Sequence, residues 1–143
     1  MRARHDVPVL DTAVRILARR SHSQAELKLK LRRRAYDSVA IEDALSRLGE
    51  LGYLDDAAFA RSLANRRGGE RGRRAIAAEL AAKGVSREVI QATLAGISDD
   101  DEVAAAGRIL SRRPDSEPAE KTVARLAHRG FSREVITKAW RMR

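Results

Sequence analysis

The side chains that usually carry catalysis are few in this chain and poorly spaced for it. Three histidines, His5, His22 and His128, lie far apart, and no H-E-x-x-H pattern surrounds them. No serine, histidine and aspartate, and no pair of carboxylates, has a spacing that indicates a reaction. Cysteine is absent. We therefore expect exposed loop histidines, no enzymatic activity and no cofactor.

Two further patterns could hold a charged ligand. Four successive acids at 99–102 could bind a metal ion, but they stand where a helix is predicted to begin, and acids there complement the helix dipole. The glycines of 68–72 follow no strand and precede no G-K-[ST], so they form neither a Walker A loop nor a dinucleotide fingerprint. We predict no metal site, and a flexible basic loop at 68–72.

Basic side chains give a stronger signal. The chain has 29 Lys and Arg against 20 Asp and Glu, a net charge of +9. Two stretches, 19–34 and 61–74, are rich in cations and contain one acid each, Glu26 and Glu70. A solvated face explains any one of these cations, but the ensemble suits a polyanion. The residues predicted to bind a polyanionic partner are Arg19, Arg20, Lys28, Lys30, Arg32, Arg33, Arg34, Arg66, Arg67, Arg71, Arg73 and Arg74.

A short unit recurs along the chain. Residues 83–94, KGVSREVIQATL, and 129–140, RGFSREVITKAW, share six of their twelve residues. A more distant copy, RAYDSVAIEDAL, begins at Arg34 and keeps the apolar positions although most letters differ. The chain therefore contains an internal repeat with a period of 46 to 49 residues.

The elements that carry these side chains are predicted to be helices. Ile41, Leu45 and Leu48 follow helical spacing, Ser23–Glu26 has the sequence of a capping box, and no window shows strand alternation. We therefore predict an all-α protein of three tandem three-helix repeats, which are helix-turn-helix-like modules that form an elongated curved molecule. The predicted bounds of the repeats are 7–51, 54–97 and 99–143.

One stretch, 78–90, also resembles a DNA-binding helix-turn-helix, because an alanine-rich segment, Gly84 in the turn and Ser86 before the next helix follow one another. A transcription regulator that binds duplex DNA is therefore an alternative. The same turn recurs at 129–132, however, and the helices after it offer no row of Asn, Gln and Arg to base edges. We interpret the turn as architectural.

Composition restricts the compartment and the mode of nucleic-acid binding. Tyr36 and Phe131 share one repeat position with Val85, and Trp140 shares another with Leu45 and Leu94. We therefore assign these three aromatic residues to the core and not to a base-stacking surface. Without cysteine there is no disulfide framework. No apolar run approaches the ~20 residues of a membrane span, and no signal peptide is apparent. We expect a cytoplasmic monomer without membrane contact.

Three segments, in this order and spacing, resemble the RecX family: RILARRSHSQAEL at 15–27, LGYLDDAAFA at 51–60, and the stretch from Gly72 to Val85. The most specific piece is GYLDD at 52–56, with Phe59 three residues on. The third repeat is matched more sparsely, mainly through Glu120, Lys121, residues 129–131 and Trp140. The arginine-rich segment 68–74 departs from the family pattern, so contacts through it can differ from those of the family.

The resemblance implies a regulator of homologous recombination, DNA repair and the SOS response. RecX proteins contain tandem three-helix repeats and bind the RecA–single-stranded DNA filament, whose ATPase, strand-exchange and coprotease activities they inhibit. The implied partners are the RecA nucleoprotein filament and, weakly and independently of sequence, single-stranded DNA phosphates. Binding in the filament groove and capping of a filament end both remain open.

Overall fold

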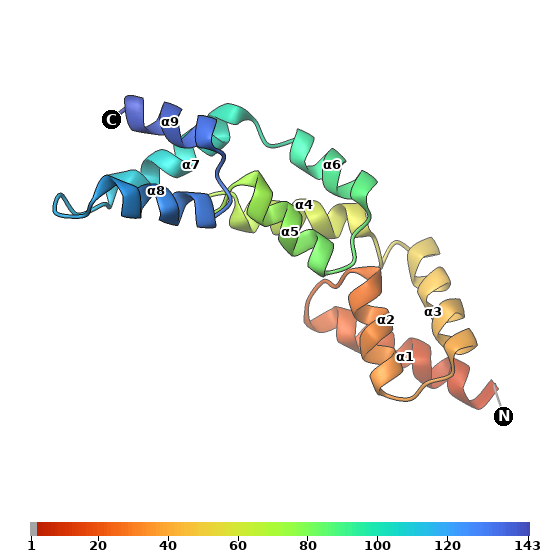
Figure 1. Ribbon diagram of the computed structural model, residues 1–143. Coiled ribbons are helices and arrows are strands. Elements are labelled where there is room, and N and C mark those ends of the chain that lie inside the picture. The colour runs from red at the N-terminus through yellow and green to blue at the C-terminus, as the bar shows by residue number, and fades with distance from the viewer. Residues whose placement is uncertain (1–2) are drawn as a thin grey trace. The chain divides into compact units, whose positions relative to one another are not determined.

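The computed structural model describes residues 3–143, with side chains from Pro8 onward. All regular structure in these residues is α-helical (Figure 1), which confirms the predicted all-α fold. No helix of this part of the chain is long and apolar enough to cross a bilayer. The helices are α1 (Ala3–Arg19), α2 (Gln24–Arg33), α3 (Ser38–Glu50), α4 (Asp56–Arg67), α5 (Arg73–Ala82), α6 (Arg87–Ala95), α7 (Asp99–Ser111), α8 (Ala119–His128) and α9 (Arg133–Arg141).

The chain divides into two compact units, of which the first runs to Phe59 and includes Lys83–Ser86. Here α1, α2 and α3 pack on one another. Leu27 and Leu31 form the buried stripe of α2, whereas Leu29 between them is 48% exposed. Because this stripe faces the core, the cations of α2 are turned outward. The core consists of Val9, Ala13, Leu27, Leu31, Ala40, Ile41, Ala44, Leu45, Leu48 and Leu54.

The second unit consists of Ala60–Ala82 and Arg87–Arg143. In it α5 packs on α6, and α7, α8 and α9 pack on one another. Phe131 is fully buried in the core of the last three helices, and Trp140 packs against that core. The aromatic positions of the repeat therefore belong to the core, as predicted. We retain the repeat bounds 7–51, 54–97 and 99–143 as a proposal.

Several helices begin at side-chain caps that the sequence indicates. Ser23 and Glu26 form a capping box at the start of α2, and Ser132 caps α9. The acids at 99–102 form the first turn of α7, where Ser98 and Asp101 make a second capping box. Their position confirms that these acids stabilise a helix start.

The turn after each second helix requires a left-handed backbone. Gly84 after α5 has φ +78°, Gly130 after α8 has φ +95°, and Ala35 after α2 has φ 63°. Glycine adopts this conformation without the Cβ clash that an L-residue suffers. The first turn therefore contains a strained alanine where the other two contain glycine.

The α5–α6 turn packs against the start of α2 within the first unit. Ser23 Oγ donates a hydrogen bond to the Lys83 carbonyl at 2.5 Å, and the Gln24 N–H donates to Asp56 Oδ1 at 2.8 Å. Gly84 lies so close to Ala25 that a Cβ at Gly84 would collide with it. We call this arrangement a joint.

An equivalent joint occurs within the second unit, where the α8–α9 turn packs against the start of α5. The Gly72 N–H donates to the Arg129 carbonyl at 2.9 Å, and the Arg73 N–H donates to Glu102 Oε2 at 2.8 Å. Gly130 lies against Ala75 as Gly84 lies against Ala25. The recurrent glycine turn thus packs against the start of another helix in both joints, which supports its architectural interpretation.

Candidate polyanion-binding site

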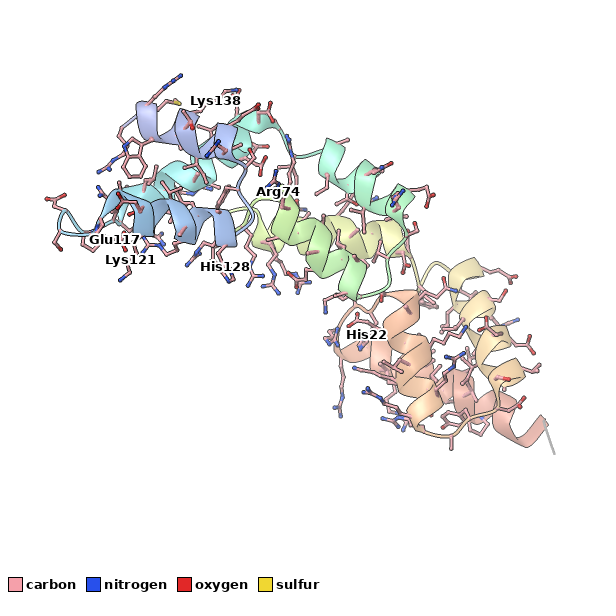
Figure 2. The ribbon with its side chains drawn as sticks, viewed as in Figure 1. His22, Arg74, Glu117, Lys121, His128 and Lys138 are labelled. Atoms are coloured by element: carbon pink, nitrogen blue, oxygen red, sulfur yellow. The ribbon has the colours of Figure 1, made fainter. Side chains whose placement is uncertain are left out.

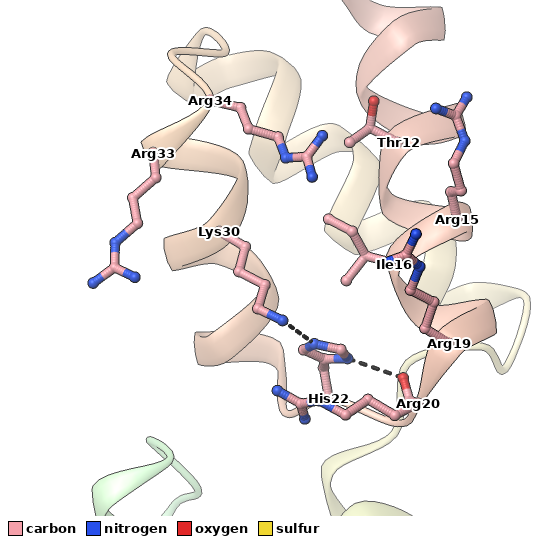
Figure 3. Close-up of a pocket in the computed structure, with 9 residues that line it drawn as sticks. All are labelled: Thr12, Arg15, Ile16, Arg19, Arg20, His22, Lys30, Arg33 and Arg34. Atoms are coloured by element: carbon pink, nitrogen blue, oxygen red, sulfur yellow. Dashed lines mark hydrogen bonds between the residues drawn. The ribbon is translucent and has the colours of Figure 1, made fainter.

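A basic pocket opens between α1 and α2 in the first unit (Figure 3). It encloses about 730 Å³, within the ~300–1,000 Å³ range of ligand sites. Six of its nine lining residues are Arg or Lys, and none is acidic. The lining residues of this basic pocket are Thr12, Arg15, Ile16, Arg19, Arg20, His22, Lys30, Arg33 and Arg34.

The two helices bring these cations together from positions far apart in the sequence. Arg15 and Arg19 are one turn apart on α1, and Lys30 and Arg33 lie in the last turn of α2. The Thr12 and Tyr36 hydroxyls are hydrogen-bonded at 2.7 Å, which ties α1 to the end of α2. Cations are favoured at the carboxyl end of a helix because the helix dipole is negative there.

His22 lies at the base of this pocket and is only 3% exposed. Its Nδ1 is 2.9 Å from the Arg20 carbonyl, and its Nε2 is 2.7 Å from Lys30 Nζ. A carbonyl only accepts and an ammonium only donates, so Nδ1 carries the proton and Nε2 accepts from Lys30. Desolvation by burial lowers the pKa of His22, which favours this neutral ring.

The prediction of an exposed loop histidine is therefore wrong for His22. The reason is that the turn between α1 and α2 folds its ring inward, where two polar partners compensate its burial. His128 is exposed as predicted, although it lies in the last turn of α8 and not in a loop (Figure 2). His5 lies in α1, and its side chain is outside the described ones.

Most guanidinium groups around the basic pocket have no acidic partner. Among the described side chains, no carboxylate lies within 4.0 Å of Arg15, Arg19, Arg33 or Arg34. Arg34 extends across the pocket toward α1, whereas Arg33 points away from the other lining residues (Figure 3). The pocket therefore concentrates positive charge that no described acid neutralises.

Arg20 differs, because it lies 3.7 Å from Glu26. Burial alone would raise the pKa of Glu26, but the Ser23 N–H and Lys83, 3.3 Å away, hold that pKa below its ordinary value. Glu26 is thus an ionised member of the joint. It neutralises Arg20 only in part, since Lys83 shares the same carboxylate oxygen.

Two predicted residues of α2 lie outside the basic pocket. Lys28 is paired with Glu42 of α3 at 2.5 Å. Arg32 is exposed and does not line the pocket. The first basic stretch is therefore divided between the pocket and the open face of α2.

In the second basic stretch, acids from other helices neutralise several cations. Arg67 makes two hydrogen bonds to Glu79, at 3.0 and 2.9 Å, and Arg71 lies 3.7 Å from the same carboxylate. Arg73 pairs with Asp99 at 3.0 Å and Glu102 at 3.4 Å. These three guanidinium groups therefore already have carboxylate partners within the second unit.

The predicted flexible loop at 68–72 is wrong at its carboxyl end. Gly72 is buried in the second joint, where a Cβ would collide with the backbone of Gly130. Arg66 and Arg74 are exposed, and no described carboxylate lies within 4.0 Å of them. Figure 2 labels Arg74 on α5. The structure thus leaves these two cations available on the second unit.

Sequence reasoning missed Arg15, Thr12 and the role of His22. Arg15 precedes Arg19 by four residues, so helical periodicity places both on one face. That spacing is the signal that could have found Arg15. No comparable signal identifies His22, because its partners depend on the turn that follows α1. Among the described residues, no group of three or more His, Cys, Asp or Glu could hold a metal ion.

Comparison with known protein families shows to which family the chain belongs. The profile of the first three-helix domain of RecX matches residues 10–48, and the profile of its second three-helix domain matches residues 55–94. The chain belongs to the RecX family. The matched RecX segments contain the whole of α2, α4 and α5, and most of α1, α3 and α6.

Curated RecX relatives resemble part of the chain. The regulatory protein RecX of Thermobifida fusca is 41% identical over 91 residues, which is 62% of this chain and 49% of that protein. The regulatory protein RecX of Chlorobaculum tepidum is 43% identical over 91 residues, which is 61% of this chain and 56% of that protein. The chain spans about half the length of the curated relatives it matches.

Solved RecX structures share the fold over nearly the whole chain. The crystal structure of RecX from Lactobacillus salivarius has a TM-score of 0.83 and 19% identity, and the alignment covers 98% of this chain and 97% of that one. Another crystal structure, of a regulatory protein RecX, has a TM-score of 0.86 and 20% identity, with 97% and 74% covered. The fold therefore matches RecX structures beyond the segments matched by the sequence profiles.

Proposed function

We propose that this protein regulates RecA: it binds the filament that RecA forms on single-stranded DNA and inhibits the ATPase, strand-exchange and coprotease activities of that filament. It thereby modulates recombination and the SOS response. Membership of the RecX family carries this proposal, because the curated relatives are named regulatory proteins. The protein acts as a cytoplasmic monomer and catalyses no reaction of its own.

The positive surface supports contact with a polyanion. Cations without acidic partners gather in the basic pocket, and DNA phosphates or an acidic protein surface would attract them. Arg32, Arg66 and Arg74 extend the proposed contact outside the pocket. We give Lys28, Arg67, Arg71 and Arg73 a smaller part, since each already pairs with a carboxylate.

The test is a titration of RecA ATPase on single-stranded DNA. The variant combines Arg15→Glu, Arg19→Glu and Arg34→Glu. The concentration of this variant that half-inhibits the ATPase should be at least about tenfold higher than that of the wild type, because each reversal replaces attraction with repulsion. Helicity should be retained, since these side chains are exposed.

The control reverses the same number of charges away from the pocket, with Arg47→Glu, Arg87→Glu and Arg133→Glu, which are also exposed. If the wild-type protein leaves RecA hydrolysis unchanged at saturating dose, the proposed function is wrong. If the pocket variant and the control behave alike, the basic pocket is not the contact. Selection of one preferred duplex sequence would instead support the helix-turn-helix regulator.

A further inference from the structure

The basic pocket has the charge arrangement of a small-anion site. Cations from α1 and from the end of α2 line one volume instead of forming a line along a single helix. Four arginines, Arg15, Arg19, Arg33 and Arg34, lack a described carboxylate within 4.0 Å. Mutual repulsion between such charges disfavours the folded unit, and a bound anion relieves that repulsion.

The density of charge selects the class of anion. A phosphodiester strand presents one charge per nucleotide, spread along its length. Four of the lining cations, Arg15, Arg19, Lys30 and Arg34, lie around a volume of about 730 Å³ and match an anion that holds several charges within a few ångströms. Linked phosphates have this property. Their oxygens also match guanidinium geometry, because arginine binds phosphate through two parallel hydrogen bonds.

The lining offers little to a nucleobase. Ile16 is its only large apolar side chain, and no Phe, Tyr or Trp ring lines the pocket. The His22 ring is only 3% exposed, and both of its nitrogens are hydrogen-bonded. Base recognition normally uses aromatic stacking or paired hydrogen bonds to base edges. The pocket therefore fits the phosphate part of a ligand and leaves the rest outside.

At the base of the pocket, His22 orients the Lys30 ammonium, which can donate hydrogen bonds to an anion. His22 Nε2 accepts one N–H of the Lys30 ammonium, so two further donors remain for an anion. The neutral ring orients Lys30 without adding a charge of its own. An anion beside Lys30 would favour protonation of His22, which makes the ring a reporter of occupancy.

We propose that the basic pocket binds free oligophosphate, as inorganic tripolyphosphate or the phosphate tail of a nucleoside triphosphate, with Arg15, Arg19, Lys30 and Arg34 as ligands and His22 orienting Lys30. Binding is indifferent to the base. The proposal does not depend on the proposed filament binding, and its test contains no recombinase.

The test titrates the full chain, in low salt and without magnesium, with four probes: orthophosphate, tripolyphosphate, ATP and a short oligothymidylate. Calorimetry measures affinity, and NMR follows the His22 ring. Tripolyphosphate and ATP should bind about equally, each at least about tenfold more tightly than orthophosphate, because more charge is neutralised at one site. Both should shift the His22 signals.

Paired variants locate the binding. Arg15→Gln with Arg34→Gln should weaken tripolyphosphate binding by about tenfold or more, since two charge-assisted contacts are lost. Arg47→Gln with Arg87→Gln removes the same charge at exposed positions outside the pocket and should change little. The thermal midpoint of the wild type, but not of the pocket variant, should rise with tripolyphosphate.

Three results would overturn the proposal. The first is tripolyphosphate binding that the pocket variant does not weaken. The second is an unchanged His22 spectrum at saturation. The third is oligothymidylate binding in the pocket more tightly than tripolyphosphate, which would make the site one for the DNA backbone. Because these experiments contain no RecA, the proposed regulatory function is tested separately, by the RecA ATPase titration.

Discussion

Helices α2 and α5 are equivalent second helices of the repeat, yet their cations lie at opposite ends. Those of α2, Lys30, Arg32 and Arg33, are in its last turn, and those of α5, Arg73 and Arg74, are in its first. The helix dipole favours cations at the carboxyl end and disfavours them at the amino end. Among the described side chains, no carboxylate lies within 4.0 Å of these three α2 cations, whereas Arg73 lies within that distance of Asp99 and Glu102.

This difference shows that the number of cations in a stretch does not determine its availability to a partner. Both stretches contain a single local acid in the sequence. Only the first leaves its cations around an open pocket, because Glu79 and Glu102 approach the second from elsewhere. Position within the helix and acids brought by folding decide which cations can bind a partner.

The largest loss of stability is expected from a substitution in the turn that follows α5. Gly84→Ala should lower the free energy of unfolding by about 3 kcal/mol, because an L-residue is strained at this φ and its Cβ would collide with Ala25. Gly49→Ala is the control, since a Cβ at Gly49, inside α3, meets nothing within 4 Å. Urea unfolding measures both; an equal response would refute the joint.

The paired cation of α5 should matter more for stability than its neighbour. Arg73→Gln should cost about 2 kcal/mol, because it leaves the Glu102 side chain, 6% exposed, without its ionic partner. Arg74→Gln, at an exposed neighbour, should stay within about 0.5 kcal/mol of the wild type. Denaturant midpoints of the two variants give the answer. Equal losses would mean that the ion pairs of Arg73 add nothing.

A substitution in the turn that follows α2 should raise stability, whereas the substitution in the turn that follows α5 lowers it. Ala35→Gly should raise the free energy of unfolding by about 0.5–1 kcal/mol, because glycine removes the strain at φ 63° but gains entropy in the unfolded chain. Guanidinium unfolding measures the gain. A loss of stability would show that the Ala35 methyl contributes packing that outweighs its backbone strain.

The smallest expected effect is a pH dependence at the base of the basic pocket. Burial lowers the pKa of His22 from its ordinary 6.5, so the stability contributed by the neutral ring is complete above pH 6.5 and is lost as the pH falls through the folded-state pKa. Unfolding measured across this range should show a slope that His22→Gln removes. His128→Gln, at an exposed histidine, should leave the slope unchanged.

Carboxylates contribute to pH dependence in a separate window. Hydrogen bonds from Thr122 and Arg125 lower the pKa of Glu117 from its ordinary 4.5, and the pKa of Glu26 is also lowered. Their stabilisation is present above pH 4.5 and is lost at lower pH. A slope that persists in His22→Gln between pH 5 and 6.5 would therefore contradict the assignment to His22.

Local sequence patterns were sufficient for much of the fold. The capping box at Ser23, the buried stripe of Leu27 and Leu31, and the turn glycines at 84 and 130 depend on neighbours within one helix or turn. Such features follow from helical periodicity and backbone conformation. The same patterns failed at His22, because its burial depends on the path of the chain after α1.

The sequence by itself determined the helices, their repetition and the excess of positive charge, because propensity, capping and periodicity act over a few residues. Only the tertiary structure decided which cations face an open pocket and which are neutralised. That outcome depends on pairs such as Arg73 with Glu102 and on the approach of Arg15 to the end of α2. Contacts of this range arise from helix packing, which no local pattern encodes.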